Sequence, residues 1–378
     1  MESFSLTDIK KKNLTDVYHY IYRSSGSSKQ AIAASLNISL PTVTQHLTTL
    51  LNAGLIEPCG QLTSTVGRRA TAYRAVGTAR ISIGIEILSR HVYISALNLY
   101  GKKEVKEKYR LAFTPDENYM STLKDLVVNF LNAHEYTEKQ ILGIGLGIQG
   151  LASRDGSQVI YGEILNCTGL TIDMFSRYFS VPCRFVHDAE CASNSELWEN
   201  PEITDAIYLS LGYHLGGAII IDGKLQSGLT GKTGTFEHMT LIPDGLTCYC
   251  GKKGCAECYC SGYALLDEGM ELEDFFAKKA NGDSRCMEKW EEYLRHLSML
   301  IHNLHMVIES TVILGGHITP YLSDSDIERI RTMVFDASTF QDPASYIIPG
   351  RCRSDAVSIG AALPFIKEFL DGFSERPL

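Results

Sequence analysis

The stretch from His238 to Cys260, HMTLIPDGLTCYCGKKGCAECYC, holds six side chains of the types that bind soft or borderline metal ions. Three of its cysteines bracket a Gly-Lys-Lys-Gly turn, whose glycines let the backbone fold back so that neighbouring thiolates converge on one ion. The histidine lies ten positions before the first cysteine, far enough for a separate strand to bring it to the same point. Four such ligands complete a closed tetrahedral zinc site, and we favour this interpretation over a set of buried free thiols. The candidates are His238, Cys248, Cys250, Cys255, Cys258 and Cys260.

Length and composition describe a globular chain of several domains. With 378 residues, two or three domains are expected. The N-terminus lacks an apolar stretch flanked by basic residues, so no signal peptide is predicted, and no apolar run is long enough to span a bilayer. A cytoplasmic protein with no membrane partner is therefore expected. In that compartment eleven cysteines indicate metal binding or free thiols rather than a disulfide framework.

Charge separates an N-terminal segment from the rest of the chain. Residues 1–76 hold eight Lys and Arg against four Asp and Glu, whereas the remainder is acidic. Apolar residues at helical spacing predict helices over 13–23, 29–36 and 40–52. Ser28 or Ser27 is expected to cap the second helix, and Ser39 the third, which has Pro41 in its first turn. The polar face of this third helix is formed by Thr42, Thr44, Gln45, His46, Thr48 and Thr49.

Helix, short turn and helix with an uncharged hydrogen-bonding face is the plan of a helix-turn-helix domain. We predict a DNA-binding winged helix-turn-helix over residues 1–78. Strands at Leu55 and over 70–76 would flank an arm whose Arg68 and Arg69 suit the minor groove. The alternative is a three-helix protein-interaction module with a solvated polar face. The side chains predicted to reach base edges in the major groove are Thr42, Thr44, Gln45 and Thr48.

The body of the chain has the pattern of two similar lobes. Alternating apolar residues predict strands within 80–99 and over 105–111, followed by a helix over 119–131 and a buried strand over 141–148. A second strand-rich segment begins at Ala206. This order favours an α/β fold of ribonuclease-H-like or actin-like lobes, with a cleft between them that suits a small ligand.

Several motifs of this body resemble the ROK family of repressors, open reading frames and kinases, and in particular its xylose-repressor-like transcriptional regulators. The resemblance extends over essentially the whole chain, the N-terminal domain included. Its most specific element is the C-x-C-G-x-x-G-C-x-E signature that ends at Glu257. The other motifs are Leu146–Gly150 with Asn166 downstream, Val186–Ala189, Leu314–Gly316 and Ala356–Ala362.

The resemblance implies a division of the chain and a set of partners. It implies a first actin-like lobe over 79–187, with a C-terminal helix over 363–378 packing back on it, and a second lobe over 188–362 that carries the zinc site. Operator DNA, a small sugar or sugar derivative as effector, and a homodimer or homotetramer are expected as partners.

The resemblance also assigns the structural zinc ion to His238, Cys248, Cys250 and Cys255. Cys258 and Cys260 then drop out of the ligand set. Cys250→Ser is expected to reduce folding and ligand response together, whereas Cys260→Ser is expected to be nearly silent.

A sugar site is implied in the cleft, with departures from the family pattern. The carboxylate that contacts sugar in the family is Thr235 here, and Glu237 is expected to point away from the ligand. For Asp188, ligand contact and capping of the helix that follows are both kept as interpretations. The positions that match the family's sugar contacts are Asn166, His187, Asp188, Thr235, His238 and Glu257.

Both phosphate-binding turns of the family's kinases are altered. The first reads Glu86-Ile87-Leu88-Ser89-Arg90 and lacks its glycines, and the second carries Tyr213 and His214 where a phosphate needs space. We therefore predict a non-enzymatic, sugar-responsive transcriptional regulator of carbohydrate-utilisation genes, a repressor with no catalytic residues. The alternatives are an ATP-dependent sugar kinase with an appended DNA-binding domain and a regulator that responds to a partner protein instead of a ligand.

Overall fold

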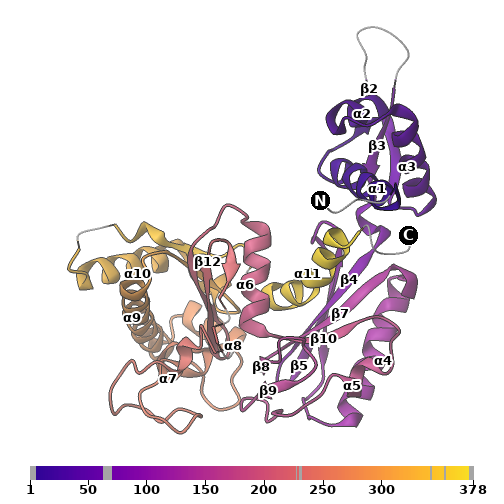
Figure 1. Ribbon diagram of the computed structural model, residues 1–378. Coiled ribbons are helices and arrows are strands. Elements are labelled where there is room, and N and C mark those ends of the chain that lie inside the picture. Colours follow the sequence, from indigo (N-terminus) through magenta and orange to yellow (C-terminus); the bar gives the residue numbers. More distant parts are fainter. Residues whose placement is uncertain are drawn as a thin grey trace.

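The computed structural model describes residues 6–62, 70–226, 228–229, 232–340, 343–352 and 355–373. The chain folds into a small N-terminal head that stands on one of two larger lobes (Figure 1). This arrangement confirms the predicted fold class, a winged helix-turn-helix followed by a two-lobed α/β body. Within the described residues, no helix is long and apolar enough to cross a lipid bilayer.

Three helices and a three-stranded antiparallel sheet of order β1-β3-β2 make up the head. The predicted caps are present: Ser28 Oγ accepts a hydrogen bond from Ala31 N at 3.2 Å, and Ser39 Oγ accepts one from Thr42 N at 3.3 Å. The first helix begins at Leu6, earlier than the predicted start at Asn13. The elements are α1 (Leu6–Tyr22), β1 (Ser27–Ser28), α2 (Lys29–Leu36), α3 (Leu40–Asn52), β2 (Ile56–Leu62) and β3 (Ala70–Ala75).

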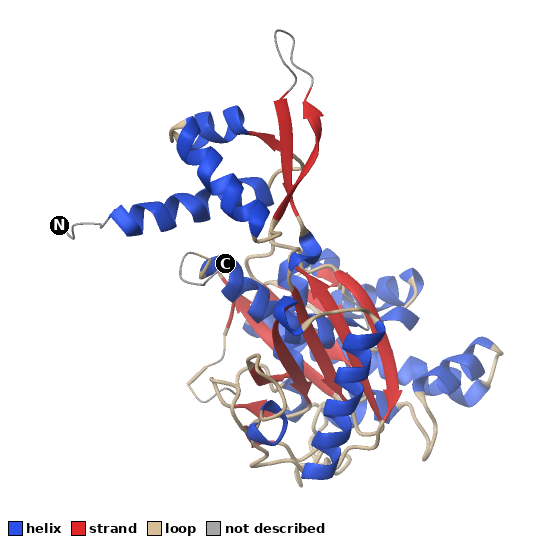
Figure 2. Cartoon of the chain, turned by 90° about the vertical axis from the view of Figure 1, so that its right-hand side faces the viewer, coloured by secondary structure: helices blue, strands red, loops and turns tan. Residues whose placement is uncertain are grey.

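The first lobe is a five-stranded sheet of order β10-β7-β4-β5-β6, which lies below the head in Figure 2. Its central strand β4 pairs antiparallel with β5 and parallel with β7. Every residue of β4 and β7 is buried, as expected for strands covered on both faces. The elements are β4 (Ile81–Ile87), β5 (His91–Asn98), β6 (Lys103–Arg110), α4 (Glu117–Ala133), β7 (Ile141–Ile148), β8 (Leu151–Ala152), β9 (Val159–Tyr161), α5 (Asp173–Ser176) and β10 (Cys183–His187).

The second lobe repeats this plan with a sheet of order β13-β12-β11-β14-β15. Its strand β11 pairs antiparallel with β12 and parallel with β14, as β4 does with β5 and β7. The elements are α6 (Asp188–Glu199), β11 (Ala206–Leu211), β12 (Leu215–Ile221), β13 (Lys224–Leu225), α7 (Glu257–Cys260), α8 (Leu272–Ala280), α9 (Ser284–Val307), β14 (Thr311–Gly315), α10 (Asp324–Ala337) and β15 (Ile347–Pro349).

The final helix, α11 (Ala356–Asp371), contacts all three parts of the molecule. It begins at Ala356 rather than at 363, and its first turns share an apolar core with the second-lobe sheet. Its middle lies so close to the first-lobe sheet that a Cβ on Gly145 would stand 1.9 Å from Ala361 O. Just beyond its end, the Phe373 ring stacks on Tyr18 of the head at a centroid distance of 4.3 Å. The head is therefore packed on the body through a shared core rather than tethered by a linker.

Candidate functional site

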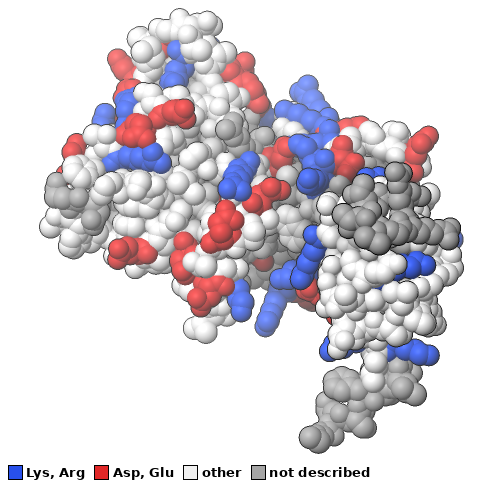
Figure 3. Space-filling model, turned by 90° about the horizontal axis from the view of Figure 1, so that it is seen from above, with Lys and Arg blue, Asp and Glu red and all other residues white. Residues whose placement is uncertain are grey.

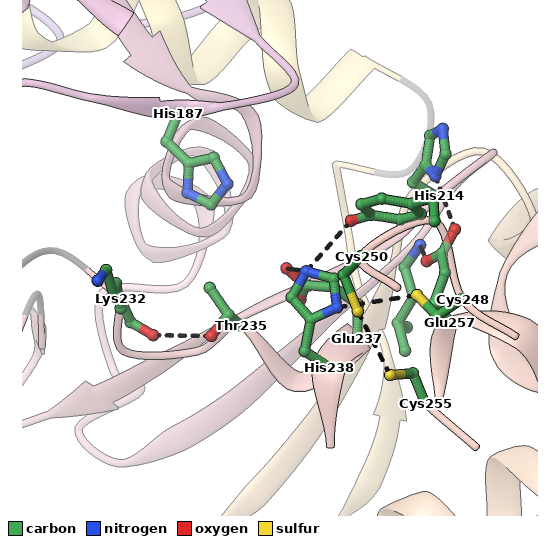
Figure 4. A network of polar contacts seen from close by, with 12 residues as sticks. His187, His214, Lys232, Thr235, Glu237, His238, Cys248, Cys250, Cys255 and Glu257 are labelled. Carbon is green, nitrogen blue, oxygen red and sulfur yellow. Dashed lines mark hydrogen bonds and ion pairs between the residues drawn. The ribbon is translucent and has the colours of Figure 1, made fainter. Parts of the chain in front are cut away.

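The four predicted metal ligands come together in the second lobe (Figure 4). The ligand atoms of His238, Cys248, Cys250 and Cys255 all lie within 4.8 Å of one another. The Cys250 and Cys255 Sγ atoms are 3.7 Å apart, and His238 Nδ1 lies 4.0 Å from Cys248 Sγ. Tetrahedral ligands about 2.3 Å from a zinc ion stand roughly 3.8 Å from each other, so the donor set and its spacing fit such an ion.

The turn between the cysteines is held by backbone contacts. Cys248 N donates to Lys252 O at 2.8 Å, and Gly251 N donates to Cys248 O at 2.9 Å. Gly254 has a φ of 78°, and a Cβ there would meet Ile242 O at 1.8 Å. A residue with a side chain is therefore excluded at this position, which fixes the direction in which Cys255 leaves the turn. Cys258 and Cys260 lie outside the cluster, and Cys260 is fully buried in the apolar core of the lobe.

A cavity of about 260 Å³ adjoins this cluster and is lined by both lobes. Ligand pockets for drug-sized molecules span about 300–1,000 Å³, so this volume suits something smaller, such as a single sugar ring. Four predicted sugar contacts line it, namely His187, Asp188, Thr235 and His238. The remaining lining residues are Gln149, Gly150, Leu151, Tyr161, Gly162, Glu163, Ile164, His214, Leu215, Gly216, Lys232, Glu237 and Tyr249.

Asp188 is the first residue of α6 and takes part in local contacts as well as lining the cavity. Its Oδ1 atom accepts a hydrogen bond from Ala189 N at 2.8 Å and lies 3.2 Å from His187 Nε2. The N-cap position of α6 is His187, which makes no side-chain cap, so the interpretation of Asp188 as the helix cap is wrong, while its place on the cavity wall stays compatible with ligand contact.

The other two predicted sugar contacts do not line the cavity. The buried Glu257 accepts hydrogen bonds with both oxygens, from His214 Nδ1 at 2.6 Å and from Leu215 N at 2.9 Å. It thereby joins α7, which follows the cysteine turn, to the start of β12. Asn166 is exposed and has a left-handed φ of 49°.

The expectation that Glu237 points away from the ligand is wrong. The segment is a 3₁₀ turn, Phe236–His238, and Glu237 lines the cavity together with Thr235 and His238. Faces do not alternate along such a turn, and even in an extended strand residues two apart share a face. Burial raises the pKa of the Glu237 carboxyl to about 8. The sequence held one signal for this residue, because Glu237 stands where the family pattern has glycine.

Sequence reasoning also missed Tyr249, the residue between the first two cysteines. Its hydroxyl lies 3.4 Å from His238 Nε2, the ring nitrogen opposite the one that faces the cysteines. Its ring packs edge-on against those of His238 and His214, at centroid distances of 5.3 and 5.6 Å. The cysteine turn therefore positions an aromatic wall of the cavity as well as the thiols.

The second altered phosphate turn places side chains between the lobes. Tyr213 donates its hydroxyl proton to Glu271 Oε2 at 2.8 Å, and Arg90 of the first lobe donates to Glu271 Oε1 at 3.2 Å. Beside them, His317 Nε2 lies 3.4 Å from the buried Glu86 Oε1. Burial raises the pKa of Glu86 to about 8 and lowers the pKa of His317 to about 4.

The predicted DNA-contacting helix α3 exposes Gln45 and Thr48, and leaves Thr42 and Thr44 half-buried. His46 was expected on the same polar face, but it is buried and burial lowers its pKa. The arm residues Arg68 and Arg69 lie outside the described residues. Seen from the side that carries the head, Lys and Arg side chains are interspersed with Asp and Glu over the lobes (Figure 3).

A model of the ROK family matches residues 82–368, and a model of winged helix-turn-helix DNA-binding domains matches residues 12–57. The chain therefore belongs to the ROK family and carries the DNA-binding head of its regulators. It is 26% identical to a xylose repressor of Caldicellulosiruptor bescii, over 81% of this chain and 83% of that protein. It is 25% identical to the DNA-binding transcriptional dual regulator NagC of Escherichia coli, over 82% of each chain.

Among solved structures, the fold is similar to that of a ROK family transcriptional regulator, a homolog of the E. coli MLC protein. The TM-score is 0.73 at 19% identity, over 97% of this chain and 98% of the other. These likenesses cover the head and both lobes, and they confirm the resemblance seen in the sequence.

Proposed function

We propose that this protein is a sugar-responsive repressor that binds operator DNA through its head. The cavity between the lobes carries the proposal, because hydrogen-bonding side chains of both lobes line it beside the metal cluster. Carboxylates and imidazoles suit the paired donors and acceptors of a sugar. The relatives named as a xylose repressor and as a DNA-binding transcriptional dual regulator support the assignment.

We propose that the effector contacts the four predicted residues that line the cavity, and that Glu257 and Asn166 support the site from outside it. The four lining residues are His187, Asp188, Thr235 and His238. A ligand that binds residues of both lobes favours a closed arrangement, and it shifts the equilibrium only by its difference in affinity for the two arrangements. Since α11 packs on both lobes and on the head, a change between the lobes reaches α1 directly.

The resident metal ion of the cluster is proposed to be zinc. Its role would be structural, because four protein ligands leave no open coordination position. The ion would hold His238 and the cysteine turn in fixed positions beside the cavity. A homodimer or homotetramer would place two recognition helices in successive major grooves of the operator.

We further propose that the protein lacks kinase activity. Arg90 and Tyr213 belong to the two altered phosphate turns, and both hydrogen-bond to Glu271 instead of leaving glycine backbone free for nucleotide phosphates. The alternative, a sugar kinase with a DNA-binding head, predicts that ATP is consumed when sugars are added. Robust turnover with any hexose, pentose or N-acetyl sugar would reverse this choice.

The test is a thermal-shift screen of sugars on zinc-loaded protein, followed by DNA binding. An operator is first selected from a random DNA library by the protein itself, and fluorescence anisotropy then measures its affinity. At least one sugar should raise the melting temperature and change the affinity for that operator. If no sugar does either, the regulator that responds to a partner protein becomes the better reading.

A further inference from the structure

Glu237 is a mostly buried carboxylic side chain, and one of its oxygens has no hydrogen-bond partner within the described residues. The side chain is 13% exposed, and its Oε2 atom is buried without a hydrogen-bond partner. Buried polar atoms in proteins are nearly always satisfied, so an orphaned oxygen on a cavity wall points to a missing partner. The cavity is where that partner would lie.

A structural role toward the metal cluster does not account for this carboxyl. Its Oε1 atom is 4.0 Å from His238 Nε2, which is beyond hydrogen-bonding distance. The same ring nitrogen is approached more closely by the Tyr249 hydroxyl, at 3.4 Å. Glu237 therefore remains free to face whatever occupies the cavity.

The charge of this wall restricts the occupant. Asp188 and Glu163 line the same cavity, so three carboxylic side chains border it against one cationic side chain, that of Lys232. Figure 4 shows Glu237 beside His238, with Lys232 standing apart near Thr235. Carboxylic groups offer no cationic partner to an anionic group on this part of the wall, whereas hydroxyl or amino donors would satisfy the free oxygen of Glu237.

We propose that Glu237 determines effector specificity by accepting hydrogen bonds from hydroxyl groups of a neutral sugar, and that it disfavours sugars with an anionic group at this end. This inference rests on the proposed sugar-sensing function. The family pattern places a sugar-contacting carboxylate at the position that is Thr235 here, and threonine cannot carry charge. The proposal assigns this carboxylate contact to Glu237, two positions further along the chain.

The experiment compares wild-type protein with Glu237→Ala and Glu237→Gln, and with Glu292→Gln on an exposed face of α9 as the matched control. Isothermal titration calorimetry uses D-xylose, D-glucose, N-acetylglucosamine and D-glucuronate as probes, and the zinc content of each variant is measured. For the neutral sugar that wild type binds best, Glu237→Ala should weaken binding at least tenfold, and Glu237→Gln should weaken it less. Both should retain one zinc ion, and Glu292→Gln should match wild type.

The anionic probe gives an independent readout. Wild type should bind D-glucuronate at least tenfold more weakly than D-glucose, and Glu237→Gln should narrow that ratio. The inference is overturned if Glu237→Ala keeps wild-type sugar affinity, or if it loses zinc together with sugar binding. Any further neutral sugar found in the thermal-shift screen is added to the probes, and if wild type binds no sugar at all, the proposed sugar-sensing function itself is what fails.

Discussion

Substitution of Cys250 by serine tests whether the cluster is a zinc site that stabilises the second lobe. Cys250 Sγ lies 3.7 Å from Cys255 Sγ and is partly exposed, so serine there perturbs packing little. Loss of one thiolate from a four-ligand set should abolish stoichiometric zinc binding. A loss of stability in Cys250→Ser is then due to the missing metal ion and not to altered packing of the apolar core.

The expected size follows from mass action. A ligand present at about 1,000 times its dissociation constant, and bound only by the folded state, adds roughly 4 kcal/mol to the free energy of unfolding. For a unit of about 150–250 residues, each kcal/mol shifts the melting temperature by roughly 2–4 °C. Zinc-loaded wild type should therefore melt about 8–16 °C above Cys250→Ser, and EDTA should lower the melting temperature of wild type only.

Two neighbouring cysteines serve as controls. Cys258 is partly exposed and lies outside the cluster, so Cys258→Ser should keep both zinc and stability. Cys260 is fully buried in the apolar core, where a serine hydroxyl without a partner costs about 1–3 kcal/mol. Cys260→Ser should thus keep its zinc but lose stability, which replaces the sequence-based expectation of a nearly silent change.

Two measurements test whether the cluster is a stabilising zinc site: the zinc content of each variant by atomic emission, and its melting temperature by calorimetry with and without EDTA. The reasoning is refuted if Cys250→Ser retains one zinc ion per chain, or if Cys258→Ser loses it.

Three further outcomes are expected. Because the folded pKa of Glu86 is about 8, against an ordinary value of 4.5, the folded state keeps a proton that the unfolded chain releases, so stability should fall as pH rises toward 8. His317, with a lowered pKa of about 4, makes stability rise with pH, but only below pH 6.5. Between pH 6.5 and 8, the free energy of unfolding in urea should therefore fall less steeply with pH for Glu86→Gln than for wild type. An equal slope in the two proteins would contradict this. Phe373→Ala removes the ring stacked on Tyr18 and should cost up to about 3–5 kcal/mol, with increased hydrogen exchange in α1 but unchanged zinc content. Gln45→Ala, at an exposed position of α3, should weaken binding to the selected operator by about 1–3 kcal/mol and leave binding to unrelated DNA unchanged.

Features that depend on short stretches of sequence could be predicted. The Ser28 and Ser39 caps, the antiparallel wing strands and the convergence of three thiols around Gly251 and Gly254 are all present. Each is decided by the φ angles and hydrogen bonds of a few consecutive residues, so a pattern in the sequence carries enough information. The fold class followed for a related reason, because strand and helix periodicities are local.

The direction of a side chain within the site was decided by distant parts of the chain. Glu257 turns to His214 because the start of β12 lies beside α7, and His46 faces the head's core instead of DNA. Glu237 reaches the cavity because its segment folds as a 3₁₀ turn between β12 and the cysteine turn. No local pattern encodes such neighbours.

The sequence by itself thus determined that this chain has a DNA-binding head, two α/β lobes and a cysteine-histidine cluster, since each has a short-range signature. Only the tertiary structure decided that Glu237 and Tyr249 form the cavity beside His238, and that α11 joins both lobes to the head. The physical reason is that burial and contact arise from packing between elements far apart in the chain. The stretch from His238 to Cys260 sets where the cysteines meet, but the surrounding lobe sets what they face.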